Sequence, residues 1–344
     1  MLKKRVPPQD NLIVSVLVPA RNEEENISAC LKGLSAQNYS AFEIIVLNDH
    51  SADRTAELVK TYCHVDSRIR LIEGQELPAG WTGKNWACYQ LSRKANGEIL
   101  IFTDADNRHA PYAIANTVGW MQKLRLGLFS AFPQQITVTL AEKLVIPVID
   151  MFVYAALPLW LTYYARSPSL AAANGQWIAF TREAYNRIGG HQEVRHKIVE
   201  DVELSRLAKR KGIKILTSPG TGAVFGHMYH SWKETWEGFS KNLFGLMGYK
   251  TIPFFTVLLV LLVICVLPYF LIWLSPFSTL AAIALALNLL LRLIMVCKYR
   301  HPIFTSVVLH PLAIVFTTII GLNSFLCFKR GRVQWKGREI DFRQ

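Results

Sequence analysis

Two pairs of acidic residues have the types and spacing of groups that do chemistry. Asp104 and Asp106 are one residue apart and follow the apolar run at residues 99–103. Two carboxylates at the end of a buried strand can hold one hard cation, such as Mg²⁺ or Mn²⁺, which in turn neutralises a diphosphate. The same D-x-D pair also occurs in solvated acidic turns. The pair alone leaves both interpretations open.

Glu200 and Asp201 form the second pair, at the start of the segment VEDVELSRLAKRKG, whose apolar residues have helical spacing. Acidic residues in a first helical turn interact favourably with the helix macrodipole, which is the simpler explanation. The alternative is a general base that takes a proton from an acceptor hydroxyl. This pair by itself does not separate the two either.

The elements that must position these residues alternate between strands and helices. Apolar runs predict strands at residues 12–18, 43–47, 69–72 and 99–103. Helical spacing predicts helices at residues 22–37, 52–62 and 82–95, with Asn22 as the cap of the first. Such alternation is typical of βαβ units and predicts an α/β, Rossmann-like fold with a parallel sheet.

Ligands bind parallel sheets at the carboxyl ends of the strands. In this sequence those ends are polar: PARNE follows the first strand, NDHS the second and DAD the fourth. The sequence contains no G-x-G-x-x-G or G-K-[ST] loop, which argues against a dinucleotide site or a P-loop. Carboxylates in place of glycines suggest a nucleotide bound through its base, its ribose and a bridging metal.

The region after residue 250 has the composition of membrane segments. No Asp, Glu, Lys or Arg occurs between Lys250 and Arg292, which leaves room for roughly two spans at about 20 residues each. A third apolar run, residues 303–328, contains the helix-breaking pair His310-Pro311. We therefore predict a membrane domain at 251–328 with about three apolar segments, the third broken or re-entrant, and a basic tail at 329–344.

An apolar run within the preceding region, residues 144–164, is nearly long enough to span a bilayer. It is interrupted by Pro147, Asp150 and Pro158, and internal prolines and an acid disfavour a span. We predict an amphipathic segment that lies in the membrane interface.

The net charge of +13 fits an anionic membrane surface better than a nucleic acid. No basic helix or aromatic RNA-binding motif accompanies the charge, whereas cations flank the apolar runs: Lys241, Lys250, Lys298, Arg300, Lys329 and Arg330.

The six cysteines form no C-x-x-C pair, which argues for a reducing compartment. The start of the sequence has no apolar signal-peptide core. We expect a multi-pass protein of the cell membrane, with its catalytic domain in the cytoplasm and no nucleic-acid partner.

The order of the polar motifs is more specific than any single one. Along the chain they are Pro19-x-Arg21-Asn22-Glu23, Asp49-x-Ser51-x-Asp53, Gly83-Lys84, Asp104-x-Asp106, Asn174-Gly175-Gln176 and Glu200-Asp201. Over residues 12–245 the chain thereby resembles the inverting glycosyltransferases of family two. The resemblance implies a GT-A fold for residues 1–250, a nucleotide-sugar donor, and Mg²⁺ or Mn²⁺ as cofactor.

The resemblance also implies roles for individual residues. Asp201 would be the catalytic base, with Glu200 beside it. Asp106 would hold the metal, and Asp104 would contact the metal or the ribose of the donor. His227 falls where many enzymes of this fold place a late metal-binding histidine, although it could equally be a surface histidine. The donor would be bound by residues of the other motifs: Pro19, Arg21, Glu23, Asp49, Lys84, Asn174, Gly175 and Gln176.

Residues 227–245 and the apolar C-terminal region resemble a narrower, membrane-anchored group, the glycosyltransferases of diaponeurosporenoate and hopanoid synthesis. The Q-x-x-R-W motif of processive synthases is absent from the sequence. We therefore expect transfer of one sugar, from UDP-glucose or a similar donor, to a hydroxyl or carboxyl of a membrane-associated lipid or isoprenoid. Two alternatives remain: a same-fold transferase with a polyprenyl-linked or soluble acceptor, and a catalytically inactive membrane scaffold.

Overall fold

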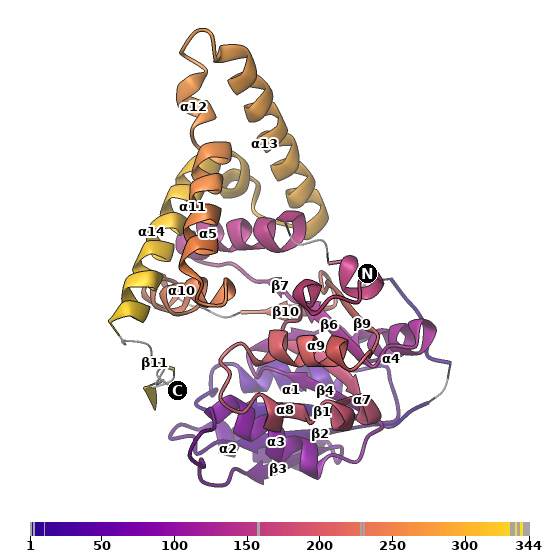
Figure 1. The fold of residues 1–344 in the computed structure, drawn as a ribbon. Coiled ribbons are helices and arrows are strands. Elements are labelled where there is room, and N and C mark those ends of the chain that lie inside the picture. The colour runs from indigo at the N-terminus through magenta and orange to yellow at the C-terminus, as the bar shows by residue number, and fades with distance from the viewer. Residues whose placement is uncertain are drawn as a thin grey trace. The chain divides into compact units, whose positions relative to one another are not determined.

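The computed structural model describes residues 2, 4–9, 11–156, 159–227, 229, 231–330, 334–335 and 338–339. The chain forms two compact units (Figure 1). The sheet unit contains Met1–Ile136 and Pro158–Met228, and the helical unit contains Thr137–Leu157 and Tyr229–Gln344. The domain predicted at residues 1–250 therefore covers the sheet unit and part of the helical unit. Most of the predicted basic tail, 329–344, lies outside the described residues.

A seven-stranded sheet forms the centre of the sheet unit, in the order β3-β2-β1-β4-β8-β6-β9. All neighbours are parallel except β8, which is antiparallel to both β4 and β6. The strands are β1 (Val14–Ala20), β2 (Phe42–Asn48), β3 (Ile69–Glu73), β4 (Ile99–Thr103), β6 (Leu128–Phe132), β8 (Trp177–Thr181) and β9 (Ile215–Pro219). The four predicted strands and the mostly parallel α/β sheet are confirmed.

Helices cover both faces of this sheet, which is why its central strands read as unbroken apolar runs. Along β1, Val16 and Val18 belong to one apolar core, with Leu31 of α1, and Leu17 belongs to the other, with Leu91 of α3. The helices of the unit are α1 (Ile27–Ser35), α2 (Thr55–Val65), α3 (Gly83–Lys94), α4 (Ala113–Leu124), α6 (Leu161–Tyr164), α7 (Arg182–Arg187), α8 (Gly190–Glu193) and α9 (Glu200–Arg210), with a 3₁₀ turn η2 (Pro168–Leu170).

The start of the first helix was predicted wrongly. Asn22 does not cap α1, which begins only at Ile27. Asn22 has a φ of 52°, in the left-handed region that asparagine tolerates better than most residues. Its Oδ1 accepts a hydrogen bond from the backbone N–H of Ala52 at 2.9 Å. The side chain therefore joins the loops after β1 and β2, which places those two loops side by side.

A second, smaller sheet lies after β4 in the chain. It has the order β5-β10-β7 and consists of β5 (Asn107–His109), β10 (Val224–Gly226) and β7 (Gln134–Gln135). β5 and β10 are antiparallel, and Gly226 is paired with Asn107. This pairing places residues 224–226, near the end of the sheet unit, beside the residues that follow Asp106.

Within the described part of the helical unit, three helices are long and apolar enough to cross a membrane: Thr251–Leu271, Ser278–Tyr299 and His310–Lys329. Its elements are α5 (Leu140–Met151), η1 (Phe152–Ala156), α10 (Trp232–Leu246), α11 (Thr251–Cys265), α12 (Pro268–Leu271), α13 (Ser278–Tyr299), η3 (Phe304–Val308) and α14 (His310–Lys329), and two short strands, β11 (Gln334–Trp335) and β12 (Arg338–Glu339). In the third apolar run the π-helix η3 ends at Val308 and α14 begins at His310. A broken or re-entrant path of this run through a membrane remains a prediction.

The first half of the run predicted to lie in the membrane interface is α5. This helix begins with a capping box between Thr139 and Glu142. Its apolar side chains are buried within the helical unit, where Leu144 and Val148 pack with Met295 of α13 and Ile314 of α14. An interfacial position for residues 144–164 remains a prediction.

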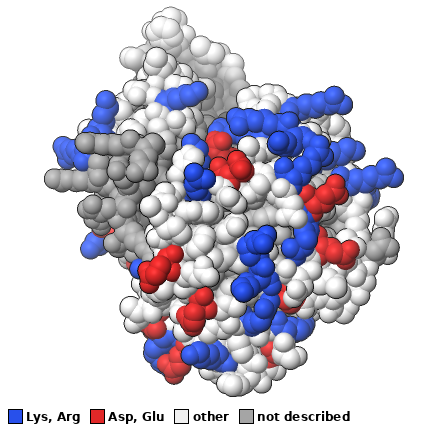
Figure 2. Space-filling view, turned by 60° about the horizontal axis from the view of Figure 1, so that its bottom comes forward, with Lys and Arg blue, Asp and Glu red and all other residues white. Residues whose placement is uncertain are grey.

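Basic side chains are distributed widely over the surface. Figure 2 shows one face on which Lys and Arg are spread over a large area, with Asp and Glu in smaller groups between them. The chain has 38 Lys and Arg against 25 Asp and Glu. This surface favours attraction to an anionic membrane.

Candidate active site

The carboxyl ends of β1, β2 and β4 meet at one edge of the large sheet, because these strands are adjacent and parallel. Arg21 and Asp49, which follow β1 and β2, are in contact there. Arg21 Nη1 donates to the Asp49 carbonyl at 2.8 Å and lies 3.8 Å from Asp49 Oδ2. Glu23 lies in the same pair of loops, with its backbone N–H donating to Thr55 Oγ1 at 2.8 Å.

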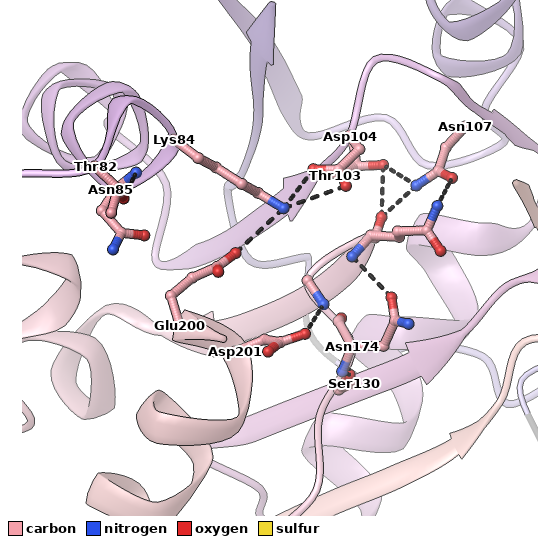
Figure 3. A network of polar contacts seen from close by, with 12 residues as sticks. Thr82, Lys84, Asn85, Thr103, Asp104, Asn107, Ser130, Asn174, Glu200 and Asp201 are labelled. Atoms are coloured by element: carbon pink, nitrogen blue, oxygen red, sulfur yellow. Dashed lines mark hydrogen bonds and ion pairs between the residues drawn. The ribbon is translucent and has the colours of Figure 1, made fainter. Parts of the chain in front are cut away.

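Lys84 lies between two carboxylates from distant parts of the chain (Figure 3). Its Nζ is 2.9 Å from Asp104 Oδ1 and 3.2 Å from Glu200 Oε1. Burial lowers the pKa of Lys84, but Asp104 and Glu200 outweigh burial and hold that pKa well above its ordinary value. Lys84 is therefore a permanent cation that joins the end of β4 to the start of α9.

Asp201 has a fixed orientation and a perturbed acidity. The backbone N–H of Gly175 donates to its Oδ2 at 2.7 Å, and the N–H of Val202 donates to its Oδ1 at 2.7 Å. Burial, together with the charge of Glu200, raises the pKa of Asp201 to about 7, against the opposing effect of Lys84 and the two N–H donors. A carboxylate that titrates near neutral pH has the acidity of an efficient general base.

The loop at residues 174–176 lies against both acidic pairs. Asn174 N donates to Ser130 Oγ at 2.8 Å, and the Gln176 carbonyl accepts from Thr103 Oγ1 at 3.0 Å. A Cβ on Gly175 would lie 3.2 Å from both Glu200 Oε1 and Lys84 Nζ. Glycine is therefore the residue that lets this loop approach the charged groups.

Two residues that the sequence analysis missed complete this part of the site. Asn85 is fully buried, and its Nδ2 donates to the carbonyls of Val194, Arg195 and Lys197 at 2.8, 3.2 and 2.9 Å. Asn85 thereby attaches the segment before α9 to α3, next to Lys84. The only signal in the sequence is its place directly after Lys84.

His191 is the other missed residue. Burial lowers its pKa to about 3, so the ring is neutral at physiological pH. Its Nδ1 is 2.7 Å from the Tyr185 hydroxyl. A small pocket includes His191 and six of the predicted residues: Pro19, Lys84, Asp104, Gly175, Glu200 and Asp201.

Asp106 and His227 are next to the same residue pair of the small sheet. Gly226 is paired with Asn107 in the antiparallel ladder, His227 directly follows Gly226, and Asp106 directly precedes Asn107. Burial, and then the charges of Asp106, Glu23 and Asp104, raise the pKa of Cys30, so all three carboxylates act on the same thiol.

The described residues contain no group of three or more His, Cys, Asp or Glu side chains arranged to hold a metal ion. Mg²⁺ often takes only one or two protein carboxylates together with substrate phosphates. The carboxylates around Cys30 suit such a cation, with Asp106 the better candidate, since both Asp104 oxygens contact Lys84 Nζ.

The sequence of this chain is similar to that of known glycosyltransferases. Residues 15–145 match the family model described as glycosyl transferase family 2. The 4,4'-diaponeurosporenoate glycosyltransferase of Staphylococcus haemolyticus is 31% identical over 235 residues, which are 67% of this chain and 60% of that relative. The enzyme of the same name from Staphylococcus aureus strain USA300 is 27% identical over 98% of this chain and 91% of its own.

The fold is also similar to that of a solved glycosyltransferase. The structure of the mannosyltransferase PcManGT from Pyrobaculum calidifontis, in complex with GDP-Man and Mn²⁺, aligns with a TM-score of 0.57 and 20% identity. The alignment covers 95% of this chain and 92% of that protein. This likeness supports the GT-A fold.

Proposed function

The chain belongs to glycosyl transferase family 2, and from this premise we propose that it is an inverting enzyme that transfers one sugar from a nucleotide-sugar donor to a membrane-associated acceptor. The observation that carries the proposal is the environment of Asp201. Its pKa is about 7, two backbone N–H groups fix its carboxylate, and the cation of Lys84 lies within the same pocket.

In the proposed reaction, Asp201 accepts the proton of the acceptor hydroxyl as the acceptor oxygen attacks the anomeric carbon. The attack comes from the face opposite the nucleotide diphosphate, so the configuration of the sugar inverts. Gly175 and Val202 orient the carboxylate through hydrogen bonds of 2.7 Å each. An acceptor carboxyl that is already ionised would need orientation but no base.

Lys84 is the group best placed to attract the donor. Its charge is permanent, and its partners Asp104 and Glu200 are side chains that can exchange with a phosphate oxygen. We propose that it contacts the donor diphosphate, while Arg21, Glu23 and Asp49 line the pocket for the nucleotide. Asn174, Gly175 and Gln176 form the loop near the donor sugar.

A divalent cation, Mg²⁺ or Mn²⁺, fits the carboxylates at the end of β4. We propose Asp106 as its main ligand, with Asp104 or His227 beside it. When bound, the cation would neutralise negative charge on the departing nucleotide diphosphate. The Mn²⁺ in the mannosyltransferase complex supports this proposal.

An apolar acceptor is supported by two observations. The relatives from Staphylococcus are named for a carotenoid acid, and the helical unit has three helices able to cross a bilayer. Anchoring the enzyme in the membrane places it where an apolar acceptor is concentrated. We propose a multi-pass membrane protein with a cytoplasmic catalytic domain, UDP-glucose or a similar donor, and a lipid or isoprenoid acceptor with a hydroxyl or carboxyl group.

The test is transfer by the full chain in detergent, with a panel of nucleotide sugars and a membrane lipid extract. Mass spectrometry of the products identifies the sugar and the acceptor together. A product from a polyprenyl-linked or soluble acceptor would support the alternative substrate class. If the wild type neither hydrolyses nor transfers any sugar in the presence of Mg²⁺ or Mn²⁺, the proposal fails and an inactive scaffold takes its place.

A further inference from the structure

Arg292 is a charged residue in the middle of an apolar unit. It lies on α13, one of the three helices able to cross a membrane, and its side chain is fully buried with 0% exposure. A buried guanidinium in such a helix is costly, so its presence points to a function. The hydrogen-bond contacts of the Arg292 side chain indicate what kind of function this is.

Two contacts satisfy only part of the Arg292 guanidinium. Nη1 donates to the Pro147 carbonyl of α5 at 2.7 Å, and Nε donates to His310 Nδ1 at 2.9 Å. Since Nδ1 is the acceptor, the ring proton of His310 is on Nε2. Among the residues that the structure describes, neither Arg292 Nη2 nor His310 Nε2 has a hydrogen-bond partner. Both remaining groups are donors.

Among the described residues, no carboxylate accepts a hydrogen bond from these two donors. Asp150 of α5 acts electrostatically on Arg292, but its Oδ2 contacts His301 Nε2 at 2.9 Å. No ion pair between Arg292 and an acid occurs within the described part of the chain. The cluster therefore combines a buried cation with unsatisfied donors, which is the chemistry of an anion site.

The backbone adds to this preference. The third apolar run breaks between η3 and α14, and His310 is the first residue of the 20-residue helix α14. The N-terminus of a helix attracts negative charge. In membrane proteins, broken helices are tolerated where the backbone lines a site.

Arg292 lies about two turns from the basic end of its helix. It lies seven residues before Tyr299, the end of α13, or about 10 Å along the helix axis. Lys298 and Arg300 are at the same end of α13, and cations of this kind mark a membrane interface. A negatively charged headgroup with an apolar chain would match both the buried donors and the apolar helices around them.

We propose that Arg292 and His310 form a binding site for the anionic headgroup, a carboxylate or a phosphate, of a long-chain amphiphile. The headgroup accepts from Arg292 Nη2 and His310 Nε2, and its chain lies along the apolar helices. Either a bilayer lipid or an acidic lipid acceptor could supply this chemistry. Binding at this site can be measured in the absence of a donor, so its test does not depend on sugar transfer.

The test is equilibrium binding of tritiated oleate to the full chain in a non-ionic detergent, with competition by other compounds. Oleyl alcohol, which has the same chain without the charge, should compete poorly, and inorganic phosphate, which has no chain, should not compete. Displacement by phosphatidic acid would identify a site open to bilayer phospholipids. Failure of phosphatidic acid to displace oleate would identify a carboxylate-specific site, as an acidic acceptor requires.

Three variants separate the site from a merely structural role. Arg292→Gln should weaken oleate binding about tenfold or more, because a charge-assisted hydrogen bond is lost. His310→Asn retains an acceptor for Arg292 at the position of Nδ1 but removes the Nε2 donor, and should weaken binding severalfold without unfolding the protein. Lys298→Gln makes the same change of charge on the same helix at an exposed position and should leave binding unchanged.

Some results would overturn the proposal. They are equal competition by oleyl alcohol or by inorganic phosphate, no saturable oleate binding by the wild type, or wild-type affinity in a folded Arg292→Gln variant. If Arg292→Gln does not fold, wild-type affinity in His310→Asn has the same consequence.

Discussion

The backbone N–H of Gly175 donates a hydrogen bond of 2.7 Å to Asp201 Oδ2, across 26 residues of the chain. Gly175 lies two residues before the start of β8, and Asp201 is the second residue of α9. This contact fixes the carboxylate from outside its own helix, while Val202 fixes it from within. The orientation of the proposed base therefore depends on the close approach of one loop, which glycine permits without crowding Glu200 and Lys84.

The variant Asp201→Asn should lose transfer while it retains donor binding. The amide keeps the size of the side chain but cannot accept the acceptor proton, and losing a general base typically costs about 10²–10⁴-fold in rate. Single-turnover transfer and donor binding by calorimetry measure the two effects separately. Glu203→Gln, in the same helical turn, is the matched control and should retain activity. A rate for Asp201→Asn within about tenfold of wild type would exclude Asp201 as the base.

The rate of transfer to a hydroxyl should rise with pH through about 7, because the base acts in its ionised form and the pKa of Asp201 is about 7. Glu200 raises this pKa, so Glu200→Gln should shift the acid limb of the profile to lower pH. Lys84 lowers the same pKa, so Lys84→Met should shift the limb to higher pH. The measurement is kcat/KM as a function of pH for the three proteins. Identical acid limbs would show that another group controls the profile.

Two glycine substitutions should separate function from folding. In Gly175→Ala the new Cβ meets the ends of two flexible side chains, Glu200 and Lys84, at 3.2 Å. We expect a folded protein with reduced turnover. In Gly97→Ala the Cβ meets the backbone N of Ser15 at 2.4 Å, which cannot give way, so this variant should unfold at lower temperature. Thermal unfolding and turnover are measured on both, and the opposite pattern would contradict the assignment.

Asn85→Asp should both destabilise the protein and reduce transfer. The carboxylate would face three carbonyl oxygens with no donor, and leaving buried groups unsatisfied costs about 1–3 kcal/mol or more. The segment at residues 194–197 would then move away from α3, and α9 with it. Thermal unfolding and kcat report the two effects. Asn38→Asp, at an exposed position, is the control. Unchanged stability in Asn85→Asp would mean that this side chain does not position α9.

Activity should require a divalent cation. Excess chelator should abolish transfer, and added Mg²⁺ or Mn²⁺ should restore it, since hard oxygen ligands suit these ions. In Asp106→Ala, the concentration of metal needed for half-maximal donor binding should rise. Glu203→Ala again serves as the control. Full activity in chelator would contradict the proposed cofactor.

The sequence by itself determined the parts of this protein that depend on local periodicity. Strands β1, β2 and β4 were predictable because a parallel strand buried on both faces is mostly apolar, as residues 99–102 are. The helix at Glu200 was predictable from the helical spacing of its apolar residues, and the three apolar segments from their length and composition. Polar residues at strand ends indicated the edge of the sheet where the site lies.

Only the tertiary structure decided which of those residues meet. The contacts of Lys84 with Asp104 and Glu200, and those of Asn85 with residues 194–197, join segments far apart in the chain. The start of α1 at Ile27 also depended on a long-range contact, because Asn22 Oδ1 accepts a hydrogen bond from the backbone N–H of Ala52 and is not available to cap the helix. The partners of Arg292, Pro147 and His310, come from two other helices. The spacing of apolar residues indicates which face of a helix or strand is buried. The residues that pack against that face depend on the fold of the whole chain.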